Sequence, residues 1–164
     1  MIEGLTVRKA VELAITTEQL GADYYTRMER KFGDKAELKE IFAQLTKDEK
    51  AHEAQFKAIL KHVPEDEPDQ KQYELYQYLR ATAISEFFNK NYFKTIENVD
   101  AADEALGHAL AFEKSTLQFY QAIQEILGDN KELASIIKAE KGHVVALMKV
   151  IMADSKFRGL GDKW

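Results

Sequence analysis

The chain has 164 residues, 45% of them hydrophobic, and a net charge of −5, which fits one globular domain large enough to bury a core. This charge provides no basic surface for nucleic acid or for anionic lipid. Because cysteine is absent, disulfides, thiolate zinc sites, iron–sulfur clusters and thiol nucleophiles are excluded. No apolar run approaches the length of a membrane span and the first ten residues do not resemble a signal peptide, so we expect a soluble, cytoplasmic protein.

Helical periodicity runs through almost the whole chain, and only Pro64 and Pro68 interrupt it. We therefore expect an all-α fold, a four-helix bundle made of two antiparallel hairpins. The single domain would divide into four segments: a hairpin at about 6–62, a crossover at about 63–99, a hairpin at about 100–155 and a tail at 156–164.

Glycines and aspartates mark the predicted helix ends. Gly33 and Gly128 are expected to end the first helix of each hairpin. Three aspartates are expected to cap the helices that follow the crossover or a hairpin turn: Asp34, Asp100 and Asp129.

Within the crossover, residues 70–90 are predicted to form a further helix with a largely aromatic stripe. The stripe consists of Tyr73, Tyr76, Leu79, Ala83, Ile84, Phe87 and Phe88, with Tyr92 and Phe93 following. It can pack on the chain's own bundle or form a dimer interface, because aromatic residues are enriched at interfaces. Glu86 lies beside the stripe, where we expect a surface position, with an additional site carboxylate as the alternative.

The same Glu-x-x-His spacing occurs twice, in Glu49–His52 and in Glu140–His143, each time on an apolar helical stripe. Residues three apart share a helix face, so each pair can direct a carboxylate and an imidazole at one point. Each pair also follows a helix whose apolar face contains one carboxylate, Glu18 in the first hairpin and Glu113 in the second. Carboxylates facing a core are costly unless they are paired, and a metal ion is the simplest partner.

One Glu from each of two helices and Glu-x-x-His from each of the other two is the ligand set of a di-iron or di-manganese site in a four-helix bundle. A single Glu-x-x-His more often lies on a solvated face, but two copies on apolar stripes are hard to obtain by chance. Tyr25 and Tyr120 are candidates to hydrogen-bond ligand carboxylates or to carry a transient radical, with core tyrosines as the alternative. The six predicted metal ligands are Glu18, Glu49, His52, Glu113, Glu140 and His143.

The two hairpins form an internal repeat. Glu18 and Tyr25 map onto Glu113 and Tyr120 at an offset of 95, whereas the Glu-x-x-His pairs map at an offset of 91. The second hairpin is therefore four residues shorter after its turn, which corresponds to a mismatch of about 6 Å at 1.5 Å per residue. Helix tilt or a π-bulge near Glu113 could absorb this mismatch.

On these six residues, the chain resembles the ferritin-like di-iron proteins, and within that group the rubrerythrin-related proteins, over both hairpins. The resemblance implies that Glu49 and Glu140 bridge two irons. It further implies that Glu18 and Glu113 are terminal ligands and that each iron binds one histidine.

The chain departs from this family at several positions. Thr116 and Gly142 stand where rubrerythrins proper carry additional glutamates, and the four cysteines of a rubredoxin domain are missing. The six-ligand set is also similar to that of bacterioferritin, although Lys50 stands at the place of its haem-ligand methionine.

The leading hypothesis is a non-haem di-iron oxidoreductase, acting against oxidative stress, that reduces hydrogen peroxide or O2 and oxidises Fe(II) with an external electron donor. Two iron ions (Fe2+/Fe3+) are the expected cofactors, with manganese as the alternative. The competing hypotheses are iron storage, an oxygenase acting on an organic substrate, and a bundle with a vestigial site. We expect a small assembly, a homodimer through the aromatic crossover, and no binding to nucleic acid or membranes.

Overall fold

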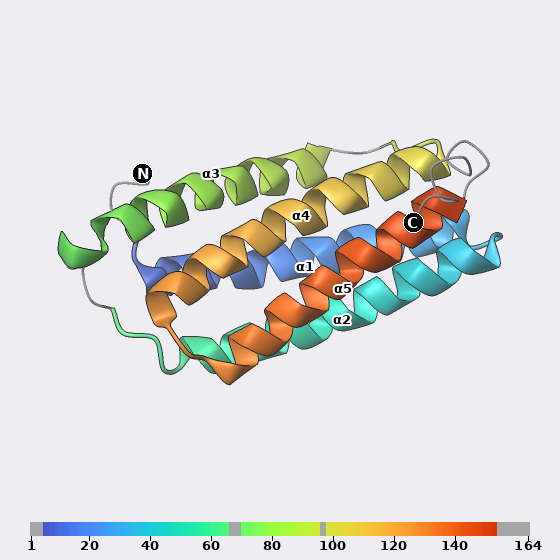
Figure 1. Cartoon of the computed structure of the whole chain (residues 1–164). Coiled ribbons are helices and arrows are strands. Elements are labelled where there is room, and N and C mark those ends of the chain that lie inside the picture. The colour runs from blue at the N-terminus through green and yellow to red at the C-terminus, as the bar shows by residue number, and fades with distance from the viewer. Residues whose placement is uncertain (1–4, 66–69, 96–97, 154–164) are drawn as a thin grey trace.

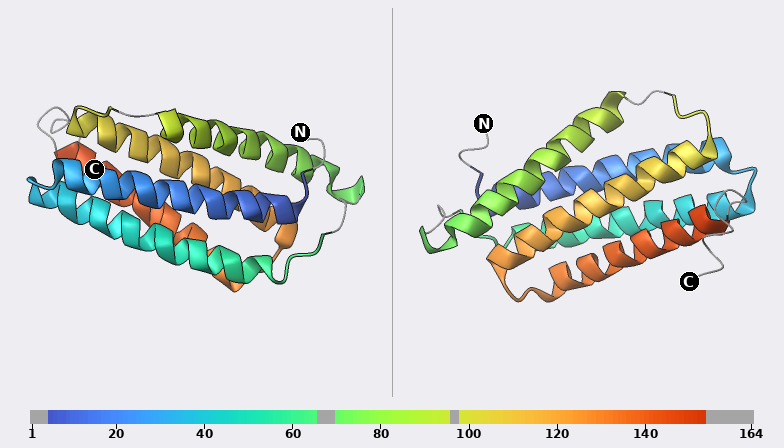
Figure 2. Two further views of the ribbon diagram at one scale, coloured as in Figure 1. Left: turned by 180° about the vertical axis from the view of Figure 1, so that it is seen from behind. Right: turned by 45° about the horizontal axis from the view of Figure 1, so that its top comes forward.

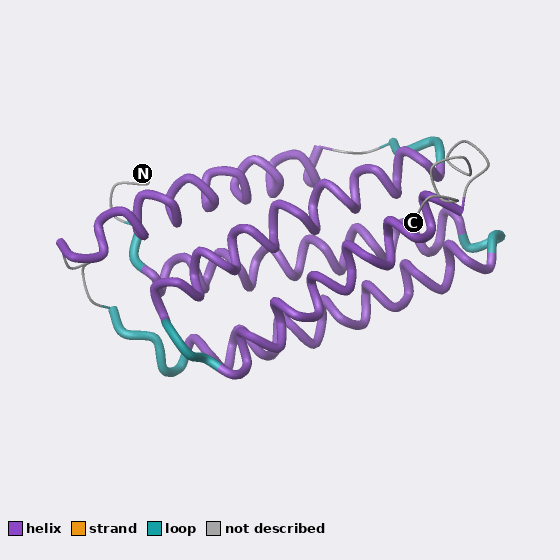
Figure 3. The backbone as a smooth tube through the Cα atoms, viewed as in Figure 1, coloured by secondary structure: helices purple, strands orange, loops and turns teal. Residues whose placement is uncertain are grey.

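The computed structural model describes residues 5–65, 70–95 and 98–153. These residues contain no strand, and all their regular structure is helical (Figure 3). The elements are α1 (Val7–Phe32), α2 (Ala36–Leu60), a 3-10 turn (Gln70–Gln72), α3 (Tyr73–Thr95), α4 (Ala102–Leu127) and α5 (Lys131–Ala153). The all-α fold is therefore confirmed, while the tail at 156–164 lies outside the described residues. In the described part of the chain, every helix is too short or too polar to cross a lipid bilayer.

Two antiparallel hairpins pack against each other as a four-helix bundle (Figure 1). The hairpins are α1 with α2 and α4 with α5; between them, α2 contacts α5 and α1 contacts α4. The crossover helix α3 runs along the length of the bundle and lies outside it, against α1 and α4 (Figure 2). Because α3 spans this length, α4 starts at the end of the bundle where α1 stops.

Three helices begin slightly later than the sequence predicted, so the three aspartates are not their N-caps. Lys35 precedes α2 and Ala101 precedes α4, and neither provides a side-chain cap. At α5, Asn130 Oδ1 accepts a hydrogen bond of 2.9 Å from the Leu133 backbone N–H. A side chain caps a helix only from the residue directly before the first turn, and Asn130 fills that position instead of Asp129. Asp34 and Asp100 likewise stand one residue too early.

The predicted crossover helix is present and extends to Thr95, and its aromatic stripe is divided between two faces. Tyr76, Leu79 and Phe93 are buried against the bundle. Several other members of the stripe are exposed, namely Tyr73, Ile84, Phe87, Phe88 and Tyr92. The stripe therefore packs on its own bundle through one face and leaves apolar side chains on the other.

Two apolar clusters fill the bundle, one toward each end. Phe56 of α2 belongs to the cluster near the start of α1, and Leu45 belongs to the cluster near the end of α1. Between these two residues, α2 buries the polar side chains of Glu49 and His52. The polar residues thus form a layer in the middle of the bundle, closed on both sides by packed apolar side chains.

Candidate metal centre

All six predicted ligands point into this middle layer. Glu18 comes from α1, Glu49 and His52 from α2, Glu113 from α4, and Glu140 and His143 from α5. The four glutamates have no exposed surface, and the two histidines are 4% and 6% exposed. The spacing argument thus identified both the helices and the faces that converge.

The six side chains form two groups of four that share two members. One group is Glu18, Glu49, His52 and Glu140, and the other is Glu49, Glu113, Glu140 and His143. Within each group, one ligand atom per residue lies within 4.8 Å of the others, a spread that suits a common metal ion. The shared residues, Glu49 and Glu140, are the two that the sequence resemblance implied as bridges.

Glu140 shows the shared geometry directly. Its Oε1 lies 2.8 Å from His52 Nδ1, and its Oε2 lies 3.5 Å from His143 Nδ1. Each imidazole also faces the carboxylate that belongs to its own group alone. His52 Nδ1 is 3.6 Å from Glu18, and His143 Nδ1 is 3.2 Å from Glu113. The two oxygens of one carboxylate therefore lie near two different histidines, one from each four-residue group.

The donor set fits a pair of divalent cations. Buried atoms without a hydrogen-bond partner include Glu18 Oε2 and both oxygens of Glu49. Such orphaned polar atoms are costly inside a protein, and metal coordination would satisfy them. Four ionised carboxylates with two neutral imidazoles carry a charge of −4, which two divalent cations would balance.

Protons compete with metal for this cluster. Burial raises the pKa of Glu49 well above its usual value, and burial and the charge of Glu140 raise that of Glu113 to about 8. Burial lowers the pKa of His52 and His143, but carboxylate contacts outweigh it and raise these values to about 9 and about 11. Glu140 is the exception, because hydrogen bonds from both histidines outweigh burial and lower its pKa. Metal binding must therefore displace protons at neutral pH.

Two buried tyrosines connect the hairpins at the cluster. The hydroxyl of Tyr25, on α1, donates to Glu113 Oε1 on α4, and the hydroxyl of Tyr120, on α4, donates to Glu18 Oε1 on α1. Each tyrosine thus holds the carboxylate of the opposite hairpin in place. The hydrogen-bonding role considered from the sequence is the one that the contacts support.

Asp48 is a partner of His143 outside the six predicted ligands. Its Oδ2 lies 3.1 Å from His143 Nε2, and Gln44 Nε2 donates to its other oxygen at 2.8 Å. A carboxylate at Nε2 favours a proton there and leaves Nδ1 free to bind a metal. The four-residue spacing of Gln44 and Asp48 predicts that they share a helix face. No pattern in the neighbouring sequence predicts the contact between Asp48 and His143 of α5.

The four-residue shortening of the second hairpin does not prevent the ligands from meeting. Helix α4 is α-helical throughout Ala102–Leu127, without the π turn considered near Glu113. The contact between Glu113 and His143 is nevertheless made, so regular helices bring these side chains together.

Glycine creates the space for one of the shared carboxylates. A Cβ at Gly21 would lie 2.6 Å from Glu49 Oε2 and 3.0 Å from Phe112 Cε1. At Gly142, beside His143, a Cβ would meet nothing within 4 Å. Of these two glycines, Gly21 alone marks a close approach to a clustered side chain.

Glu86 contradicts the expectation of a surface position. It lies on α3, is 1% exposed, and accepts hydrogen bonds from Ser115 and Thr116 of α4 and from Asn89. No local sequence signal distinguishes it from a surface glutamate, because its partners come mainly from another helix.

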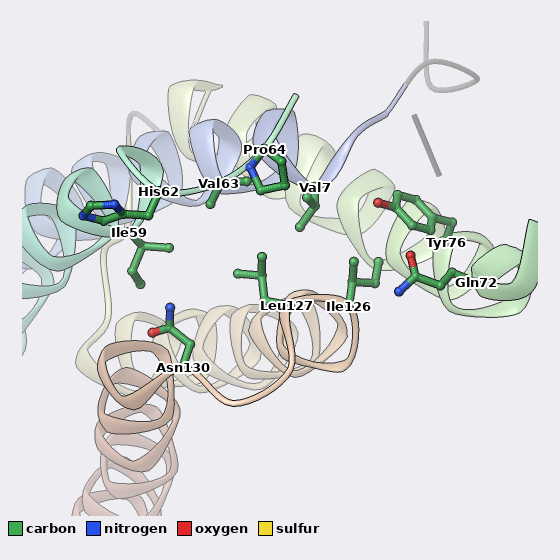
Figure 4. Close-up of a pocket in the computed structure, with 10 residues that line it drawn as sticks. All are labelled: Val7, Ile59, His62, Val63, Pro64, Gln72, Tyr76, Ile126, Leu127 and Asn130. Carbon is green, nitrogen blue, oxygen red and sulfur yellow. The ribbon is translucent and has the colours of Figure 1, made fainter. Parts of the chain in front are cut away.

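A cavity of about 550 Å³ opens at the end of the bundle where α2 and α4 stop (Figure 4). Its lining includes His62, Tyr76 and Leu127 but none of the six clustered residues. The cavity therefore lies apart from the cluster.

The fold and the cluster together define a ferritin-like helical-bundle protein with a buried carboxylate–histidine site that could hold metal. Comparison with known families agrees: the family model described as Rubrerythrin matches residues 9–151, and the chain therefore belongs to the rubrerythrin family. Members of this family typically bind iron. The chain has no significant match among curated proteins or among solved structures.

Proposed function

We propose that the chain is a non-haem di-iron oxidoreductase that reduces hydrogen peroxide or O2 while it oxidises Fe(II). The observation that carries this proposal is the pair of four-residue groups that share Glu49 and Glu140. When bound, two adjacent ferrous ions supply two electrons, which is the number needed to cleave peroxide to water.

The six residues would hold the two metal ions in different ways. Glu49 and Glu140 would bridge both ions, Glu18 and His52 would complete one position, and the remaining two residues, Glu113 and His143, would complete the other. Burial of the six side chains limits the access of bulk water to the reacting centre. The hydroxyl groups of the two tyrosines would fix the positions of the terminal carboxylates. An external donor would reduce the oxidised iron again after each turnover, because the chain contains no cysteine for an internal thiol or iron–sulfur relay.

Metal stoichiometry tests the bridging roles. Glu49→Ala should abolish the paired site, leaving at most one iron per chain by elemental analysis of anaerobically loaded protein. Glu40→Ala, the same change at an exposed position of α2, should still bind two. If Glu49→Ala retains two irons with an unchanged spectrum, the bridging role is wrong. Elemental analysis of freshly purified protein separates iron from manganese.

Stopped-flow mixing tests the reaction. The Fe(II)-loaded protein should be oxidised faster by hydrogen peroxide than by O2, and turnover should stop unless a reductant is added. Faster reaction with O2, together with hydroxylation of an added apolar substrate, would favour an oxygenase instead.

A further inference from the structure

Glu86 is a buried carboxylate outside the proposed metal site. It belongs to the crossover helix α3, and the side chains that face it come from three helices. These are Thr17 of α1, Asn89 of α3, and Ser115 and Thr116 of α4. None of these four neighbours is titratable, so the ionisation of Glu86 is controlled by burial and by neutral hydrogen-bond donors.

Its hydrogen bonds distinguish Glu86 from the carboxylates of the metal cluster. Ser115 and Asn89 donate to Oε1 at 2.8 Å and 3.0 Å, and Thr116 donates to Oε2 at 3.2 Å. Both oxygens are therefore satisfied, whereas neither oxygen of Glu49 has a hydrogen-bond partner. This environment suits a group that exchanges protons, and it leaves no orphaned atom that a cation would have to satisfy.

A line of hydroxyl groups connects Glu86 to solvent. Ser85, which is exposed, lies 2.8 Å from Ser115 through the two Oγ atoms, and Ser115 donates to Glu86. Hydroxyl groups both donate and accept, so each can pass a proton along such a line. Exposure falls from Ser85 through the half-buried Ser115 to Glu86.

On its other side, Glu86 faces the polar layer of the bundle. Thr116, the donor to Oε2, is fully buried and lies three residues after Glu113 and four before Tyr120. Residues at these spacings share one face of a helix, about 4.5 Å apart along the axis for three residues. Thr116 therefore lies between a proposed metal ligand and the tyrosine that donates to Glu18.

The proposed reaction consumes protons inside a site that excludes water. When peroxide accepts two electrons from two Fe(II), its O–O bond breaks, and two protons must be delivered to form two water molecules and two Fe(III). All six clustered residues are buried, so these protons need a path through the protein.

We propose that Glu86 is the proton relay of this reaction, taking protons from the Ser85–Ser115 hydroxyl pair and passing them toward the metal site through Thr116. The role rests on the proposed function, and Glu86 acts through its neighbours without touching the oxidant. Burial raises the pKa of Glu86 to about 7, although the hydrogen bonds from its neighbours oppose this shift. A carboxyl with this pKa can both release and regain a proton near neutral pH.

The first test uses metal-free protein and therefore does not depend on turnover. With carbon-13-labelled glutamate side chains, NMR should show one carboxyl resonance that titrates near pH 7 and disappears in Glu86→Gln. The control Glu74→Gln removes an exposed glutamate of the same helix and should retain that resonance. If no resonance lost in Glu86→Gln titrates between about pH 6 and pH 8, the relay is overturned.

The second test follows the oxidation of Fe(II)-loaded protein by peroxide from pH 6 to pH 9, in water and in heavy water. Glu86→Gln should bind two irons yet react roughly tenfold to hundredfold more slowly, with an altered pH profile and a larger solvent isotope effect. Ser115→Ala keeps the carboxylate but breaks the line to solvent, and it should also slow the reaction, whereas Glu74→Gln should match the wild type.

The outcomes separate the relay from the function on which it rests. A wild type that reacts, with Glu86→Gln at the same rate and pH profile, overturns the relay alone. If Glu86→Gln does not fold, a wild-type rate in Ser115→Ala overturns it. A wild type that binds iron but does not react with peroxide overturns the proposed function and the relay together.

Discussion

Replacing Gly21 by Ala should separate the stability of the fold from its capacity to hold metal. The new Cβ would lie 2.6 Å from Glu49 Oε2, whereas ordinary contacts begin at 3.4 Å, so the carboxylate must move by about 0.8 Å. This is roughly four times the 0.2 Å tolerance of metal–ligand distances. Losing even an outer partner of a metal ligand typically costs 10–100-fold in affinity, so displacing a bridge should cost at least about 100-fold. That loss removes about 2.7 kcal/mol of metal-linked stabilisation.

The metal-free protein should tolerate the same change. The closest atom is the end of a flexible side chain, and Ala gains about 1 kcal/mol over Gly in a helix interior, which offsets the shift of Phe112. The melting temperature of metal-free Gly21→Ala should therefore stay within a few degrees of the wild type, while its increase on iron loading should shrink by about 5–10 °C. The matched control is Gly142→Ala, where the methyl group meets open space and iron affinity should be unchanged. If Gly21→Ala binds two irons with wild-type affinity in competition with a chelator, Glu49 does not bridge the metals.

Two further predictions concern pH and assembly. The free energy of unfolding of the metal-free protein should fall as the pH rises from about 5 to about 9. The reason is that Glu113 and His52 bind protons more tightly in the folded protein, where their pKa values are about 8 and about 9, than in the unfolded chain. Denaturant titrations with a chelator present should show this fall, and stability rising over the same range would contradict it; iron-loaded protein should lack the fall. We also propose a homodimer through the exposed face of α3, so light scattering should give about twice 18.8 kDa and Phe88→Glu should give monomers. A particle of about 24 subunits with a mineral core would favour iron storage instead.

The cluster was predictable because its information is local to each helix. A Glu and a His three residues apart share a face whatever the rest of the chain does, and flanking apolar residues indicate that the face is buried. The same pattern, one Glu followed by Glu-x-x-His, occurs in each half of the chain, and this repetition predicted that two hairpins pack together around one site. The helix caps were misplaced by one residue because the turn geometry, and not the preference for aspartate, decides where each helix begins. Only at α5 are the aspartate and its neighbour, Asp129 and Asn130, both plausible caps.

Glu86 could not be placed from the sequence for a different reason. Its neighbours Phe87 and Phe88 are apolar, and a helix that buried them would have turned Glu86 toward solvent. The observed rotation exposes both phenylalanines and buries Glu86, where Ser115 and Thr116 donate to it. The choice depends on hydroxyl groups about 30 residues away on α4, which no local pattern connects to α3.

Each hairpin supplies side chains to the residues that the other hairpin places in the cluster, so neither hairpin forms its part of the site alone. Each four-residue group takes three members from one hairpin and one shared glutamate from the other, and each terminal carboxylate is held by a tyrosine of the opposite hairpin. Each hairpin therefore encodes three of the four members of one group and lacks only the shared glutamate of its counterpart. Two identical hairpins facing each other could provide the same groups to one another. The bundle thus resembles a fused pair of half-proteins, and neither four-residue group is complete until the two halves dock.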